Sequence, residues 1–211
     1  MFANLVSTNT RPKLTREARR ASIVKAAAQL FAAQGFRGVT TRELAAAAGI
    51  SEPVLYEHFK TKRDLYSAII EDKHSAAQCV LEQRLQAFDK SGDDRGFFLQ
   101  LANAICDYVS KDQTYSRIML YASLEGHELA DISFKQNATW FYNFVCENIR
   151  RRQKTGAFRD IDPMLAARAF ACMIHEYSLY DLNFGFKVVK LSKKKTIEGM
   201  VDIFLNGIAA K

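Results

Sequence analysis

The sequence contains few residues that interrupt helices and no apolar run that approaches the length of a membrane span. Only 3 of its 211 residues are proline and 10 are glycine, which leaves room for long uninterrupted helices. Its longest apolar runs, such as Ala169–Ile174, are far shorter than the roughly 20 residues that a membrane span needs. Residues 1–10 have neither a charged start nor a long apolar stretch, so we expect no secretory signal and a cytoplasmic protein.

Patterns that mark metal sites and common catalytic sites are also missing. The four cysteines are far apart and form no CxxC pair, which favours buried, reduced thiols over a zinc site: Cys79, Cys106, Cys146 and Cys172. The pair His127-Glu128 has no second histidine at the spacing of a zinc protease motif. Neither a glycine-rich phosphate loop nor a nucleophile elbow occurs. We therefore predict no catalytic residue, no metal and no cofactor.

What the sequence does contain is a strongly uneven distribution of charge. The formal net charge of the chain is +7. Residues 1–70 carry 11 Lys and Arg against 5 Asp and Glu, whereas residues 71–211 carry 19 against 18. The excess therefore lies in the first third of the chain, which is the candidate for contact with a polyanion. Charge alone leaves nucleic acid and an anionic membrane surface equally open.

Hydrophobic periodicity predicts helices throughout the chain. Apolar residues recur at helical spacing in the first segment, where Ile23, Ala27, Leu30 and Phe31 lie on one stripe. No segment shows the alternation of a strand, so we expect an all-α protein. The predicted longer helices cover residues 15–35, 62–89, 95–110, 113–125, 128–153, 163–184 and 193–210.

Between the first two long helices lies the pattern of a helix-turn-helix. Thr40 and Glu43 have the spacing of a capping box at the start of a short helix. Gly49 ends this helix, and Ser51 is placed to cap the next one, with Pro53 in its first turn. Two short helices joined in this way often place the second helix in the DNA major groove.

Residues 39–66 read VTTRELAAAAGISEPVLYEHFKTKRDLY, and this segment resembles the DNA-binding domain of the TetR family of bacterial transcriptional regulators. The shared features are a threonine-rich start, an alanine-rich helix, Gly-Ile-Ser, and the Leu-Tyr-x-His-Phe run with a later lysine. The resemblance covers roughly residues 15–70. It implies a helix-turn-helix domain over residues 1–61 and a helical ligand-binding and dimerisation domain over residues 62–211.

The resemblance also implies which residues contact double-stranded DNA. They are Thr40, Thr41, Arg42, Ser51, Glu52, Pro53, Val54, Tyr56, His58 and Lys62. We expect Thr41, Tyr56, His58 and Lys62 to meet phosphates, and Val54 to contact a thymine methyl group. Glu52 departs from the family pattern, and is expected either to accept from a cytosine amine or to repel phosphate. A basic arm precedes these residues: Arg11, Lys13, Arg16, Arg19 and Arg20.

For the C-terminal domain, the resemblance implies a cavity for a small, partly apolar effector. The candidate lining residues are Cys106, Met119, Trp140, His175 and Tyr177. The helices at 163–184 and 193–210 resemble dimerisation helices, and a homodimer would read a near-palindromic operator.

Together these features predict a transcriptional repressor that leaves its operator when the effector binds. A transcriptional activator of the same fold remains an alternative. Less favoured alternatives are an all-helical enzyme with an incidental helix-turn-helix and a membrane-surface protein with a basic amphipathic first helix.

Overall fold

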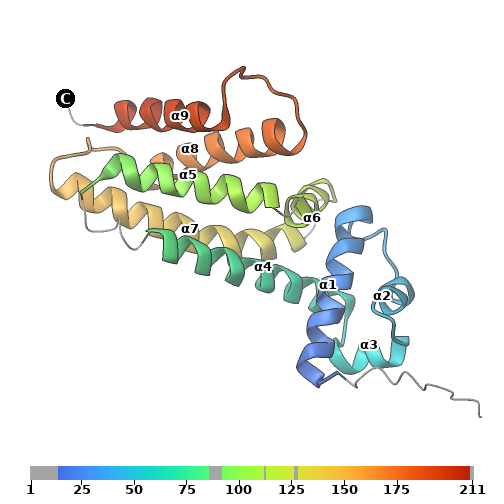
Figure 1. Ribbon diagram of the computed structural model, residues 1–211. Helices are drawn as coiled ribbons and strands as arrows, with labels where there is room; N and C mark the ends of the chain where they lie inside the picture. Colours follow the sequence, from blue (N-terminus) through green and yellow to red (C-terminus); the bar gives the residue numbers. More distant parts are fainter. Residues whose placement is uncertain (1–13, 86–91, 112, 126–127, 210–211) are drawn as a thin grey trace, which may run out of the picture.

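The computed structural model describes residues 14–85, 92–111, 113–125 and 128–209, with the side chains of residues 77 and 128–138 left out of the description. Within these ranges the protein is built from α-helices (Figure 1). Their bounds are α1 Arg16–Gln34, α2 Thr41–Ala47, α3 Glu52–His58, α4 Lys62–Leu85, α5 Asp94–Lys111, α6 Gln113–Leu124, α7 Glu128–Lys154, α8 Pro163–Tyr177 and α9 Lys193–Ile208. An isolated bridge between Phe158 and Ala209 is the one β-type pairing in the described residues. The all-α prediction is confirmed.

Helices α1–α3 form a small unit at one end of the molecule, which we call the head (Figure 1). The core of the head is closed by three aromatic rings: Phe31, Phe36 and Tyr66 lie 5.5–5.7 Å apart between centroids. The predicted core residues Leu44, Ala45, Leu55 and Phe59 are all buried there.

Helices α4–α9 form the larger part of the molecule, which we call the body. Helix α5 lies in its middle and packs against α4, α8 and α9, while α7 packs against α4 and α8 (Figure 1). Phe98 is fully buried on α5, with its ring 4.9 Å from both Phe170 of α8 and Phe204 of α9. These aromatic contacts join the three helices at the end of the body that is remote from the head.

Helix α4 belongs to both units. Its first half contributes Leu65, Tyr66 and Ile69 to the core of the head, and its second half contributes Leu81 and Leu85 to the core of the body. The division expected between residues 61 and 62 therefore coincides with the start of this shared helix, and packing runs continuously across it.

The segment predicted as one helix over residues 163–184 has a change of hydrogen-bond register. Helix α8 ends at Tyr177 and continues as a π-helical turn, η1, over Ser178–Asn183. Asn183 donates to the carbonyl of Val109 at 3.2 Å, which attaches this turn to α5. No helix in the described part of the chain is long and apolar enough to cross a membrane.

Candidate DNA-binding surface and effector cavity

The predicted helix-turn-helix is present, and local interactions account for its shape. Thr40 and Glu43 form the expected capping box at the start of α2, and the hydrogen bonds from Thr40 lower the pKa of Glu43. Gly49 has a φ of +67°, a conformation that favours glycine, and it turns the chain between α2 and α3. Ser51 takes the N-cap position of α3, but its side chain makes no capping hydrogen bond, contrary to expectation.

The outer face of α3 presents the side chains that the sequence predicts. Ser51, Pro53 and Tyr56 are exposed, and Glu52, Val54 and His58 are half-buried. Tyr56 is 48% exposed, so most of its ring lies outside the core of the head. Thr40 and Arg42 are exposed at the start of α2, beside this face.

Two of the expected phosphate ligands are engaged within the protein. The Thr41 hydroxyl donates to Oε1 of Glu52 at 2.6 Å, which ties the start of α2 to the start of α3. The Lys62 ammonium donates to the carbonyl of Val39 and lies 4.4 Å from the centroid of the Phe36 ring. Burial lowers the pKa of Lys62. Lys62 thus joins α4 to the head, and its expected contact with a phosphate stays a prediction.

The described residues of the basic arm, Arg16, Arg19 and Arg20, lie in two different surroundings. Arg16 and Arg19 line a groove of about 820 Å³ between the start of α1 and α3, where Val54 and His58 also lie. The guanidinium of Arg20 lies 4.4 Å from the centroid of the Phe59 ring, so this residue packs on the head. The expectations for Arg11 and Lys13 fall outside the described residues.

The body contains a cavity of about 600 Å³, which is within the range of small-molecule sites. Helices α4 to α8 and the turn η1 contribute to its wall. The lining residues are His74, Gln78, Leu81, Ala104, Ile105, Tyr108, Val109, Tyr115, Ser116, Met119, Leu120, Ser123, Trp140, Phe141, Tyr142, Arg168, Ala171, Cys172, His175 and Leu179. Its interior is therefore mostly aromatic and aliphatic.

Three of the five expected effector residues line this cavity, namely Met119, Trp140 and His175. Cys106 and Tyr177 are not among the residues that line it, since both are buried in the core of the body. Sequence reasoning missed other lining residues, among them His74 and Arg168.

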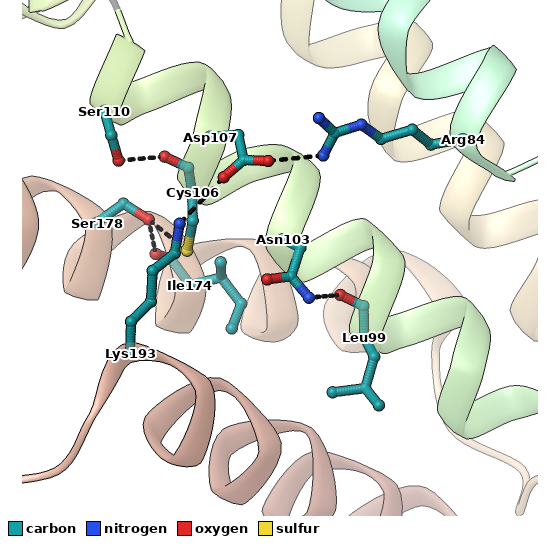
Figure 2. Close-up of polar contacts among 9 residues, drawn as sticks. All are labelled: Arg84, Leu99, Asn103, Cys106, Asp107, Ser110, Ile174, Ser178 and Lys193. Carbon is teal, nitrogen blue, oxygen red and sulfur yellow. Dashed lines mark hydrogen bonds and ion pairs between the residues drawn. The ribbon is translucent and has the colours of Figure 1, made fainter.

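Figure 2 shows where Cys106 lies: it faces Ser178, whose hydroxyl donates to the Ile174 carbonyl at 2.7 Å and contacts the Cys106 sulfur at 3.2 Å. Its neighbour Asp107 accepts from Arg84 of α4 and Lys193 of α9. These polar contacts tie η1, α4 and α9 to α5. The Ser178–Cys106 contact is buried, whereas the contacts of Asp107 are partly exposed to solvent.

The end of α1 is held by side chains from α6, which we call the α6–α1 contact. Arg117 donates to the carbonyl of Ala32 at 2.7 Å, and the Tyr121 hydroxyl donates to the carbonyl of Ala33 at 3.0 Å. These carbonyls lie in the last turn of a helix, where the helix itself offers no donor. Ile118, from the same face of α6, is 1% exposed and packs in the core of the head.

The opposite face of α6 looks into the cavity, through Tyr115, Ser116, Met119, Leu120 and Ser123. One short helix thus touches the cavity on one side and the end of α1 on the other. Just beyond α6, a carboxylate oxygen of Glu125 accepts from the backbone N–H of Arg37 at 3.2 Å.

Comparison with family models agrees with this architecture over most of the chain. Residues 23–69 match the model for "bacterial regulatory proteins, tetR family". Residues 98–207, more than half of the chain, match the model for the "AefR-like transcriptional repressor, C-terminal domain". The chain belongs to the TetR family. It is a helix-turn-helix, DNA-binding transcriptional regulator.

Individual relatives match over most of the chain. The uncharacterised HTH-type transcriptional regulator YvkB of Bacillus subtilis is 25% identical over 202 residues, 89% of this chain and 96% of its own length. The HTH-type transcriptional repressor KstR2 of Rhodococcus jostii is 30% identical over 157 residues, 72% of this chain and 74% of its own. The crystal structure of AibR with isovaleryl coenzyme A and operator DNA has a TM-score of 0.63 and 19% identity, covering 88% of this chain and 97% of that one.

Proposed function

We propose that this regulator is a repressor that binds its operator through the head and releases it when a small molecule enters the cavity of the body. The observation that carries the proposal is the position of α6 between the cavity and the end of α1. A ligand that shifts α6 changes the contacts that hold the head, so the two sites share one movable element. The match to an AefR-like repressor domain favours repression over activation.

In this proposal the exposed faces of α2 and α3 contact the operator. Arg42, Ser51, Pro53, Tyr56 and His58 are placed to reach DNA without rearrangement, because their side chains are exposed or half-buried on this surface. Thr40 lies beside them, and Val54 offers an apolar contact. Thr41 and Glu52 are already bonded to each other, so a contact from either of them to DNA requires that this hydrogen bond opens.

We further propose that the protein acts as a homodimer through α8 and α9. These helices leave large apolar side chains exposed in the single chain, including Leu165 at 59% and Ile203 at 71%. Exposed apolar surface of this kind is typical of subunit interfaces. A twofold dimer would place two copies of α3 about 34 Å apart, one turn of the DNA helix.

DNA binding is tested by fluorescence anisotropy with the DNA upstream of the protein's own gene, in competition with unrelated DNA. We expect salt-sensitive binding that prefers the upstream sequence. Arg42→Ala and Tyr56→Ala should each weaken binding by about tenfold, whereas Arg150→Ala, an exposed arginine at the far end of α7, serves as the control. If neither head variant changes the affinity for DNA, then α2 and α3 are not part of the DNA-binding interface.

The direction of regulation is tested by transcription in vitro from the bound promoter. A repressor lowers the amount of transcript as its concentration rises through the dissociation constant. A rise in transcript would instead assign the protein as an activator of the same fold.

A further inference from the structure

The cavity of the body has an unbalanced set of charges. Arg168 is the single formally charged side chain among the described residues that line it, and His74 and His175 are the other titratable bases. No aspartate or glutamate appears among those lining residues. A cation in this space would find no counter-charge among them, whereas an anion would find a guanidinium.

The basic groups of α8 are concentrated on one wall. Arg168, Cys172 and His175 follow one another at spacings of four and three residues, so they lie on one face of α8. Their side chains stay exposed to solvent while lining the cavity. Burial raises the pKa of the nearby Tyr142 hydroxyl and the charge of Arg168 opposes that rise, which places the guanidinium within electrostatic reach of Tyr142.

The other walls carry uncharged polar groups such as Gln78 and Ser116, but most of their surface is apolar. Trp140 and Phe141 of α7 and Met119 and Leu120 of α6 line the cavity, and the ring of His74 meets that of Trp140 edge to face at 6.3 Å. A ligand that fills this space buries apolar surface against α6 and α7, with its polar end toward α8. The cavity is thus amphipathic, with a cationic side and an aromatic side.

From this arrangement we propose that the effector is an anionic amphiphile, whose carboxylate or phosphate group binds Arg168 and whose apolar body packs against Trp140 and α6. The inference rests on the proposed function and narrows its ligand to one chemical class. A fork-shaped guanidinium binds either kind of oxyanion through paired hydrogen bonds, so both anions share one chemistry. The apolar body lies against the same helix whose other face holds α1.

Trp140 makes a direct test possible, because it is the one tryptophan of the chain and it lines the cavity. The full-length protein, without DNA, is titrated with decanoate, decyl phosphate, decanol and decyltrimethylammonium below their aggregation concentrations. Tryptophan fluorescence is recorded, and thermal unfolding provides a second readout. We expect the two anions to bind at least tenfold more tightly than decanol, and the cation to bind most weakly.

Three variants locate the anion site. Arg168→Gln should abolish the preference for the anions and leave the affinity for decanol unchanged. Arg168→Lys should retain part of the preference, since it keeps the positive charge. Arg159→Gln, which removes an exposed arginine that does not line the cavity, should behave as the wild type.

The inference is overturned if decanol binds as tightly as the anions, if the cation binds best, or if Arg168→Gln keeps the preference. Failure of the proposed function is recognised separately, because operator binding is measured without any ligand. Operator binding without anion preference contradicts the ligand class alone. Anion preference without operator binding contradicts the proposed function alone.

Discussion

The head and the body use the same kind of helix but pack it differently. In the head, α1 to α3 and the start of α4 enclose a dense core, in which Phe31, Leu44 and Leu65 are each at most 1% exposed. The body has an aromatic core cluster between α5, α8 and α9, and it also contains a cavity of about 600 Å³ lined by α4 to α8 and the turn η1. A rigid head keeps the side chains that contact DNA at a fixed spacing. The body, in contrast, needs an unfilled volume that a ligand can occupy. The largest differences should therefore appear when matched substitutions are made in the two regions or at their junction.

The junction should be the most sensitive place. Gly35 has a φ of +74°, and a Cβ added there would lie 2.8 Å from the ring of Tyr121 on α6. Gly156 has the same φ of +74° but no atom within 4 Å of such a Cβ. We expect Gly35→Ala to lower the free energy of unfolding by about 3 kcal/mol and Gly156→Ala by about 1 kcal/mol, as measured by urea denaturation. Equal losses in the free energy of unfolding would show that α6 moves away from Gly35 at no energetic cost.

A second pair compares the two interiors. Ala27 in the head is 1% exposed, and Ala104 is 2% exposed but lines the cavity. Enlarging the first overpacks a dense core, so Ala27→Leu should destabilise by about 2 kcal/mol. Ala104→Leu has empty volume to enter and should change stability by less than about 1 kcal/mol, while weakening the binding of decanoate. If Ala104→Leu destabilises the protein as much as Ala27→Leu does, the larger side chain at position 104 does not enter the cavity.

A third prediction concerns the dense part of the body. Burial raises the pKa of Asp107, but the hydrogen bonds from Arg84 at 2.8 Å and Lys193 at 3.0 Å outweigh it, so the pKa is lowered overall. A carboxyl group of this kind stabilises the fold above its unfolded pKa of about 3.9, and the stabilisation disappears as the pH falls through its lower folded value. Asp107 is 38% exposed, so solvent screening keeps the effect to about 1 kcal/mol or less.

Asp107→Asn should therefore reduce stability at pH 7 by up to about 1 kcal/mol, and this difference should shrink as the pH falls below about 4. Asp160→Asn, at an exposed position between α7 and α8, is the control. A difference that persists unchanged at pH 3 would mean that the ion pairs to α4 and α9 are not its source.

The smallest effect is expected for Lys62 in DNA binding. The ammonium is directed toward Val39 and Phe36, so Lys62→Gln should leave the slope of log affinity against log salt unchanged. Arg42→Gln should reduce the magnitude of that slope by about 1, as expected for the loss of one phosphate contact. A reduction of the same size for Lys62→Gln would show that Lys62 turns outward when the operator binds.

The sequence predicts the helix-turn-helix of the head, because the caps and turns that shape it depend mainly on residues close together in the chain. A capping box joins two residues three positions apart, and a tight turn depends on one glycine. Both can therefore be predicted from a short stretch of sequence. The direction of the Lys62 side chain cannot be predicted in this way, because it depends on a carbonyl group 23 residues earlier in the chain. The same applies to the Thr41–Glu52 hydrogen bond, which spans two helices.

The body was predicted less completely. The helix positions followed from periodicity, but the cavity depends on how five helices and a turn pack in space. For this reason the sequence predicts Cys106 and Tyr177 at the ligand site, although both lie in the core of the body. Arg117 and Tyr121 of α6 and Glu125 directly after it follow one another at intervals of four residues, and such a polar stripe beside apolar positions indicates a specific partner.

The two faces of α6 also constrain the thermodynamics of regulation. If a bound molecule on one face loosens the head on its operator by some factor, then the operator-bound protein must hold that molecule more weakly by the same factor. Free copies of the regulator would consequently capture the signal first. The effector concentration needed to release the promoter would then rise with the number of regulator molecules in the cell. The expression level of the regulator would therefore set the effector concentration at which transcription begins.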